Sequence, residues 1–293
     1  MAISLIFASA ALVSADTLVS INGFSFYTNS DGEAVIAGCD KSLTDIEIPD
    51  SLINAKVTEI ANNAFWGNGS LKSVSFEKAD GLHKIGSNAF CGCTAISSVA
   101  LPYPVELGYG AFQGCTELES FSAAEGLTNI PVQAFNGCEK LCDVRLPDSL
   151  TSIDDYAFAN CASLSTITIP ASVTYISNDA FPDSPNVTIR CDYGSAAYTY
   201  AIENNITCSL LDPIDLGDAN NDGVININDV TAIQRHVAEM QMLEGLLFIA
   251  ADVTQNGKIE ISDATTMQMY FAEYNITEPI GEKIVLKASD SNK

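Results

Sequence analysis

Basic side chains are scarce in this sequence. Its 293 residues include 13 Lys and Arg against 37 Asp and Glu, which gives a formal net charge of −24. Nucleic acids and anionic membranes both attract basic surfaces, because phosphates must be neutralised. The composition therefore argues against both as partners and is typical of a soluble protein with a solvated extracellular surface.

Recognisable catalytic combinations are also missing. The sequence has two His, His83 and His236, and neither belongs to a nucleophile–base motif. There is no Gly-rich phosphate loop and no zinc-ligand spacing, and the acidic residues are scattered rather than arranged as a general-acid pair. We therefore expect that the protein is not an enzyme.

Long apolar runs are absent except near the start. Residues 3–15 (ISLIFASAALVSA) end in Val13-Ser14-Ala15, with small residues at −3 and −1 relative to a cut after Ala15. This pattern resembles the back half of a secretory signal peptide, although the basic segment that normally precedes the apolar run is missing, since the first Lys is Lys41. The run is too short to span a bilayer. An N-terminal strand or helix is the alternative. We expect residues 1–16 to be a signal-peptide remnant, and the protein to be secreted, extracellular and without a membrane span.

Cysteine is present, but not as a disulfide framework. The nine Cys are an odd number and include no CxxC motif. Four of them recur at one position of a repeat, which favours packing over bridging. A bridge between Cys191 and Cys208 stays open, because sequence alone does not fix a pairing.

A repeat occupies about residues 40–190. The dipeptide Ala-Phe recurs at intervals of 22 to 25 residues, with an aliphatic residue five before each Phe and Cys three after four of them. Apolar residues at nine and eleven after each of the first five Phe predict a short strand with two inward side chains. One repeat has no partner for its own apolar side, so stacking neighbours must share a core. The recurring residues are Phe65, Phe90, Phe112, Phe135, Phe158 and Phe181, with Cys93, Cys115, Cys138 and Cys161.

Units such as residues 150–170 (LTSIDDYAFANCASLSTITIP) resemble the bacterial surface leucine-rich repeats called the BspA-like, or type 5, family. The resemblance implies a β-solenoid, and similar repeats are associated with adhesion and protein contacts. Phe24–Tyr27 and Ala34–Ala37, around Asn29-Ser30-Asp31-Gly32, predict an N-terminal capping hairpin. Residues 194–205 predict a capping helix at the other end. We expect the repeat domain with its caps to span residues 17–211.

The outward strand residues, eight and ten after each of the first five Phe, would line one exposed sheet face. Such faces often bind partners in repeat proteins, although small hydroxyl residues can equally just solvate a flat sheet. No aromatic residue occupies these positions, which counts against sugar stacking. They are Ser73, Ser75, Ser98, Ala100, Ser120, Ser122, Asp143, Arg145, Thr166 and Thr168.

Two twelve-residue loops, 34 residues apart, place oxygen-bearing side chains at positions 1, 3, 5, 9 and 12 and Gly at position 6. A hard cation takes six to eight oxygens, and Gly permits the sharp bend that the loop needs. Each loop precedes a segment with one apolar helical face. The sequence therefore predicts two Ca²⁺ sites of EF-hand-like loops.

Loop and helix are duplicated together, and position 12 of each loop is Asp. Pro213 and Gly217 argue against a helix before the first loop. This arrangement resembles a type I-like dockerin, at residues 212–277. Carried over by position, the first set of ligands is Asp218, Asn220, Asp222, Val224 by its carbonyl, Asn226 and Asp229. The second set is Asp252, Thr254, Asn256, Lys258 by its carbonyl, Glu260 and Asp263.

The dockerin resemblance implies a partner, the cohesin module of a scaffoldin in a cellulosome that degrades polysaccharides. Contacts in such modules come from loop positions 10 and 11 and from positions 17 and 18. Here these are Ile227, Asn228, Gln234 and Arg235, and Ile261, Ser262, Gln268 and Met269.

The sequence as a whole predicts an α+β chain: a leucine-rich-repeat β-solenoid with a capping hairpin and helix, then a small α dockerin, then a tail at residues 278–293. We expect a non-catalytic extracellular cellulosome component whose repeats bind a protein or adhere to a surface. Two alternatives stay open: a docked regulator or inhibitor of another secreted protein, and a carbohydrate-binding repeat module.

Overall fold

The computed structural model describes residues 18–211, 215–239, 243, 245–273, 278–282 and 285–286. The expected signal-peptide remnant lies outside these residues. The chain divides into two compact units, residues 1–164 with 179–185, and residues 165–178 with 186–293. Each unit is described by itself below.

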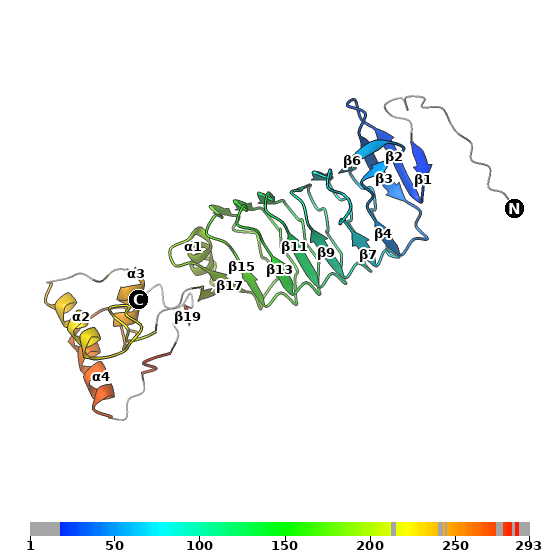
Figure 1. Cartoon of the computed structure of the whole chain (residues 1–293). Coiled ribbons are helices and arrows are strands. Elements are labelled where there is room, and N and C mark those ends of the chain that lie inside the picture. Colours follow the sequence, from blue (N-terminus) through cyan, green and yellow to red (C-terminus); the bar gives the residue numbers. More distant parts are fainter. Residues whose placement is uncertain are drawn as a thin grey trace. The chain divides into compact units, whose positions relative to one another are not determined.

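The first unit is a β-solenoid, as the repeat predicts (Figure 1). Its strands are β1 Val19–Ile21, β2 Phe24–Thr28, β3 Ala34–Cys39, β4 Asp45–Glu47, β5 Ser51–Leu52, β6 Ala55–Ile60, β7 Ser73–Ser75, β8 Lys84–Ile85, β9 Ser98–Leu101, β10 Glu106–Leu107, β11 Ser120–Ala123, β12 Asn129–Ile130, β13 Asp143–Arg145 and β14 Ser152–Ile153.

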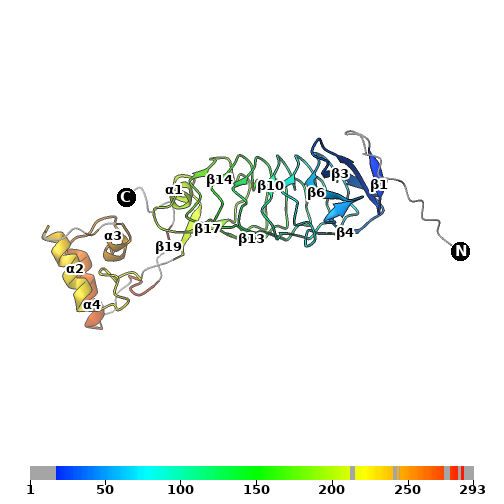
Figure 2. The same ribbon diagram turned by 45° about the horizontal axis from the view of Figure 1, so that its top comes forward.

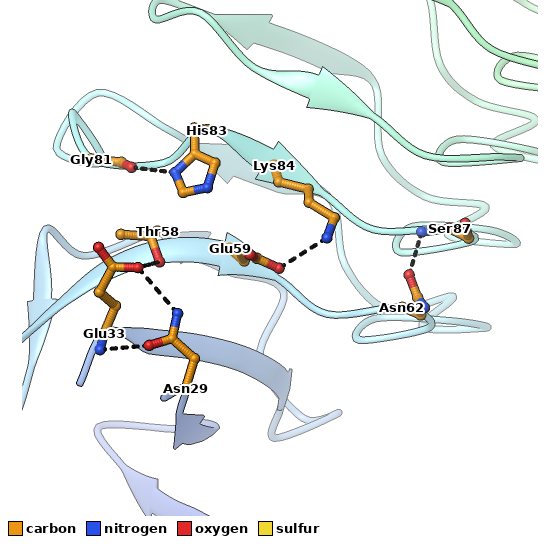
Figure 3. A network of polar contacts seen from close by, with 9 residues as sticks. All are labelled: Asn29, Glu33, Thr58, Glu59, Asn62, Gly81, His83, Lys84 and Ser87. Atoms are coloured by element: carbon orange, nitrogen blue, oxygen red, sulfur yellow. Dashed lines mark hydrogen bonds and ion pairs between the residues drawn. The ribbon is translucent and has the colours of Figure 1, made fainter. Parts of the chain in front are cut away.

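The predicted hairpin of β2 and β3 starts the solenoid. It is antiparallel, and β1 adds a third antiparallel strand outside it. From β3 onward the pairing turns parallel, through β6, β8 and β10. Figure 3 shows polar contacts near this cap. Thr58 of β6 donates to the Glu33 carboxylate of the cap at 3.2 Å, and Lys84 of β8 pairs with Glu59 of β6 at 3.2 Å, which joins the first coils to each other.

Two columns of parallel strands run along the first unit. One contains β4 with β7 and β9 with β11 and β13, and the other contains the short strands from β6 to β14. Figure 2 shows β6, β10 and β14 on one side of the coil and β4 and β13 on the other. In the first column Ser98 pairs with Ser120, and Ser120 pairs with Asp143. The outward residues of β7, β9, β11 and β13, from Ser73 to Arg145, form what we call the strand face.

The core between the columns is a stack of phenylalanine rings. Neighbouring rings lie 4.8 to 5.7 Å apart between centroids with interplanar angles of 7 to 13°, from Phe65 through to Phe181. Beside the stack, the Cys138 thiol donates to the Phe112 carbonyl of the preceding coil at 3.2 Å, and the other repeat cysteines make the corresponding bond to the coil before their own. The cysteine column therefore supplies hydrogen bonds as well as packing.

A third side of the coil consists of turns rather than strands. We call the segments 62–67, 87–92, 109–114, 132–137 and 155–160 the turn edge. Three N–H···O bonds join each segment to the next, for example from Asn63, Phe65 and Gly67 to the carbonyls of Ser87, Ala89 and Cys91. The residues two before and two after each Phe have positive φ, which alternates the direction of the backbone and aims these donors at the next coil.

The second unit contains strands and all four helices of the described chain. Its elements are β15 Thr166–Thr168, β16 Tyr175–Ile176, β17 Thr188–Cys191, α1 Ala196–Glu203, β18 Thr207–Leu210, α2 Ile227–Val237, α3 Gly245–Ala251, α4 Ile261–Phe271 and β19 Val285–Leu286. The strands β15, β17 and β18 are parallel, and α1 is the predicted capping helix, with Ser195 as its N-cap. Every helix among the described residues is too short or too polar to cross a membrane.

The tail returns to the strands of the second unit. Val285 and Leu286 of β19 pair antiparallel with Ser209 and Cys208 of β18. The sequence contains no signal for this pairing, because a two-residue strand has no periodicity. The thiols of Cys191 and Cys208, between which the sequence left a bridge open, lie 3.3 Å apart and are free in the structure.

Candidate calcium centre and binding surfaces

Loop one runs from Asp218 to the first turn of α2. Gly223 has φ of +78°, the left-handed bend expected at position 6, and a Cβ at this position would meet nothing within 4 Å. The Asp218 carboxylate accepts from the Asp222 and Gly223 amides at 3.1 and 3.0 Å. The loop therefore wraps around its first ligand, as a cation-binding loop requires.

The loop ends where the helix begins. Asp229 accepts from the Asn220 amide at 3.2 Å and from the Asn226 amide at 2.7 Å, while Asn226 is the N-cap of α2. Positions 3, 9 and 12 are thus tied together by one carboxylate. The helix starts at Ile227, three residues before the apolar pattern begins at Val230, because the cap belongs to the loop.

Loop two repeats this geometry. Asp252 accepts from the Asn256 and Gly257 amides at 3.0 and 2.6 Å, and Asp263 accepts from the Thr254 and Glu260 amides at 2.9 and 2.8 Å. Thr254 departs from Asn at position 3, and its hydroxyl donates to Asp263 at 2.9 Å. Its oxygen is therefore held beside a carboxylate that a cation would also contact.

The loops differ in what precedes them. The described residues 215–217 before loop one are not helical, as expected, but α3 ends at Ala251, directly before Asp252. The sequence reasoning missed this helix, which begins with Gly and has seven residues, too few for a periodic signal. A shared core of Val230, Ile233, Leu243, Val253, Ile259, Ala264 and Met267 packs the two loop–helix motifs together.

The electrostatics of the loops favour a bound cation. Asp229 and Asp263 are fully buried, and Asp218 and Asp252 are at most 8% exposed. The ion pairs in the described part of the chain all lie in the first unit, so none neutralises these carboxylates. Burial raises the pKa of Asp229 and Asp252, with repulsion from neighbouring carboxylates adding to it. Buried carboxylates without a counter-charge are costly, and a cation would supply that charge.

The donor set fits calcium rather than a softer metal. Among the described residues, no three His, Cys, Asp or Glu side chains converge as a preformed cage. Each predicted loop instead mixes carboxylate, amide or hydroxyl oxygens with one main-chain carbonyl, and flexible oxygen ligands are what Ca²⁺ accepts. The other side chains predicted as ligands in these loops are Asn220, Asp222, Asn226, Asn256 and Glu260.

The predicted partner residues are mostly at the surface. Ile227 and Ile261 are 60% and 61% exposed, which is unusual for isoleucine at the start of a helix. Asn228, Gln234, Arg235, Gln268 and Met269 are also exposed, and Ser262 is half-buried. Positions 10 and 17 of each motif are seven residues apart and so share one helical face.

His236 has a structural partner. Its Nδ1 accepts from the Leu243 amide at 2.9 Å, and its ring packs edge-on against Phe248 with 6.0 Å between centroids. It therefore fastens the end of α2 to the segment before α3. His83 likewise lies in a coil turn, with its Nδ1 3.4 Å from the Gly81 carbonyl oxygen.

A repeat solenoid and a duplicated loop–helix module together define a modular protein built for binding. The family model for the BspA type leucine-rich repeat region matches six copies over residues 11–106 and 58–188, and that for the dockerin type I domain matches residues 216–293. The chain belongs to the BspA-type leucine-rich repeat family and carries a C-terminal dockerin. Both are protein-interaction modules without catalytic activity of their own, and type I dockerins bind calcium.

One solved structure supports the solenoid fold, and a second is reported for its sequence similarity. A leucine-rich cell surface protein from Faecalibacterium prausnitzii is 27% identical over 60% of this chain and 55% of that one, with a TM-score of 0.51. A leucine-rich repeat protein from T. pallidum is 25% identical over 59% of this chain and 71% of that one, with a TM-score of 0.40. The chain thus spans about half the length of the F. prausnitzii protein. A comparison with curated proteins finds no match.

Proposed function

We propose that this chain is a non-catalytic, extracellular cellulosome component. Its dockerin takes up two Ca²⁺ ions and docks on a cohesin module of a scaffoldin, and its repeats present a protein-binding or adhesion surface. The observation that carries the proposal is the pair of buried carboxylates in each loop, Asp218 with Asp229 and Asp252 with Asp263. Their 34-residue repeat gives the module two equivalent sites.

The cohesin surface is proposed to lie on α2 and α4. The two faces are related by the duplication but differ in chemistry, because Arg235 on one corresponds to Met269 on the other. An exposed arginine selects an acidic or polar partner patch, whereas methionine selects an apolar one. We therefore expect one face to dominate the binding of any given cohesin.

Titration calorimetry of the full chain against a panel of cohesins, with calcium and with a chelator, tests this proposal. We expect binding by at least one cohesin in calcium and none after chelation. Arg235→Ala and Met269→Ala should reduce the affinity unequally, and Thr231→Ala, an exposed change on α2 outside the predicted contacts, serves as the control. Calcium-independent binding, or no binding across a broad panel, would contradict the dockerin role. Equal losses would contradict a dominant face.

The strand face is the proposed protein-binding surface of the repeats. Its first six positions, from Ser73 to Ser122, are small and uncharged, so a partner backbone can approach the sheet closely. Asp143 and Arg145 form an exposed ion pair at 3.2 Å beyond them. Pull-down of secreted proteins with wild type and with Ser98→Arg tests this surface, and an unchanged set of captured proteins would contradict it.

A further inference from the structure

Exposed aromatic rings of the first unit gather on the turn edge rather than on the strand face. Trp66, Tyr109 and Tyr156 are 60%, 45% and 41% exposed, and all three belong to turn-edge segments. The Ala and Phe in the middle of each segment are largely buried and face the core. Apart from Gly110 and Ala159, which are buried, the outward positions are those two and three before each Phe and those one and two after it.

The outward positions of the turn edge are nearly free of charge. Across all five segments the only acidic or basic residue at these positions is Asp155. The chain as a whole has a net charge of −24, so an uncharged strip along five coils is a local departure from its composition. The side chains that replace charge are mostly aromatic rings, amides and glycines.

Cross-coil contacts arrange these groups into a row. The Tyr109 hydroxyl donates to the Gln133 side-chain oxygen one coil further on. The Asn160 amide donates to the Asn136 side-chain oxygen at 3.1 Å, again across one coil. Neighbouring coils are about 4.8 Å apart, so the coils that carry Tyr109 and Tyr156 are roughly 10 Å apart, with the coil of Gln133 between them.

Tyr156 is kept at this position against the conformational preference of its residue type. Residues two before each Phe of the turn edge have φ between 56 and 59°, and the first three coils place Asn63, Asn88 and Gly110 there. Asn and Gly adopt the left-handed region readily, whereas a tyrosine there is strained by its Cβ. An exposed ring whose packing does not repay such strain is typical of a functional surface.

We propose that the turn edge from Tyr109 to Asn160 binds an uncharged polysaccharide chain. Aromatic rings stack on the C–H faces of sugars, and the amides of Gln133 and Asn136 can both donate to and accept from sugar hydroxyls. A row along successive coils fits an extended chain rather than a single sugar. A polyanionic chain would be repelled by Asp155 and by the net charge. The turn edge shares no residue with the strand face or the dockerin, so the inference goes beyond the proposed function.

Affinity electrophoresis of the full chain with calcium tests the inference. The gels contain hydroxyethyl cellulose, mixed-linkage β-glucan, xyloglucan or galactomannan, with polygalacturonate as the charged comparison. We expect retardation by at least one of the four uncharged polymers. Tyr109→Ala and Tyr156→Asn should each weaken it by about tenfold, the scale of losing one aromatic anchor. Tyr175→Ala, at a 54% exposed tyrosine on β16, is the matched control and should change nothing.

Tyr156→Asn also separates binding from folding. It installs the residue type that the first two coils use, so its melting temperature should equal or exceed that of wild type while retardation falls. Three results would overturn the proposal: no retardation in any uncharged gel, equal retardation by polygalacturonate, or undiminished retardation of the double variant. Capture of a secreted protein through Tyr156, without retardation by polysaccharide, would overturn it in favour of a protein partner.

Discussion

The solenoid and the dockerin are both built by duplication, but they bury opposite kinds of titratable group. In the solenoid, burial raises the pKa of Cys93 and Cys161 to about 12, so these thiols stay neutral and donate to carbonyls. In the dockerin, the buried groups are carboxylates, and no basic side chain among the described residues pairs with them. The neutral cysteine column needs no counter-charge, whereas the buried carboxylates of the two loops need a cation from solution. The two halves should therefore fail under different conditions.

Chelation is expected to have the largest effect and to act on the dockerin alone. Without calcium, repulsion between Asp218 and Asp229, and between Asp252 and Asp263, acts in a buried site, and metal binding is coupled to folding. Calorimetry with EDTA should show loss of the dockerin transition, with the solenoid transition unchanged. Asp155→Asn, at an exposed solenoid carboxylate, is the control and should not alter the response. A calorimetric unfolding trace that EDTA leaves unchanged would contradict the expectation that the dockerin, unlike the solenoid, depends on a bound cation.

Alkaline pH is the converse stress and should act on the solenoid. The thiol pKa is raised from 9.0 to about 12 in the folded state of Cys93 and Cys161. Below pH 9.0 both states hold the proton and the stabilisation is complete. As the pH rises toward 12, unfolded thiols ionise while folded ones do not, so stability falls by about 1.4 kcal/mol per thiol for each pH unit.

Urea unfolding from pH 8 to 11 measures this loss. The dockerin contains no cysteine, so its midpoint should move less over the same range. The single variant Cys161→Ser removes one ionisable group and should flatten the solenoid profile. Parallel profiles for wild type and variant would show that the ladder thiols do not control alkaline stability.

Substitution of Cys138 measures how much one residue of the cysteine column contributes to the stability of the solenoid. Its thiol donates to the Phe112 carbonyl, which also accepts from the Cys115 amide at 3.2 Å. Cys138→Ala removes a buried sulfur and one of two hydrogen bonds, so we expect a loss of about 2 kcal/mol. Cys138→Ser should cost less, because Ser184 makes the same bond to the Phe158 carbonyl at 2.7 Å at the end of the column. Equal losses in chemical denaturation would mean that only volume matters.

Sequence reasoning succeeded where the information is local or periodic. The columns of Phe and Cys recur at a fixed interval, so they could be predicted. The same holds for the capping hairpin, where turn residues separate two apolar runs. The ligand positions from Asp218 to Asp229 lie within one loop, and their role as ligands stays a prediction.

Features that depend on distant residues or that oppose local preference were not predictable. The β18–β19 pair joins segments that the whole dockerin separates. The hydrogen bonds of the cysteine thiols could not be predicted, because the sequence does not tell which carbonyl of the neighbouring coil lies beside each thiol. Tyr156 adopts a conformation that its residue type disfavours, so propensity points away from it. The turn edge could therefore not be predicted from the sequence, because it forms only when successive coils stack.

The hairpin between β5 and β6 provides the smallest test, by relieving strain in the solenoid rather than adding it. Ile53 and Asn54 have φ of 47 and 63° in its two-residue turn, where Asn and Gly are the preferred residues. Ile53 is 53% exposed, so its side chain gains little burial in return for a left-handed backbone. Ile53→Asn should stabilise the solenoid by about 1 kcal/mol and leave the dockerin transition where it is.

Leu18→Asn is the matched control for that variant. Leu18 is 61% exposed, like Ile53, but its φ is not positive, so the same change of polarity relieves no strain there. A solenoid midpoint that rises for Ile53→Asn alone would assign the gain to the backbone. A rise for both variants would assign it to the loss of exposed apolar surface, and a fall for Ile53→Asn would mean that the isoleucine makes contacts that outweigh its strain. In each case the chelator-sensitive transition reports whether the effect stays within the solenoid, as the neutral core of that half requires.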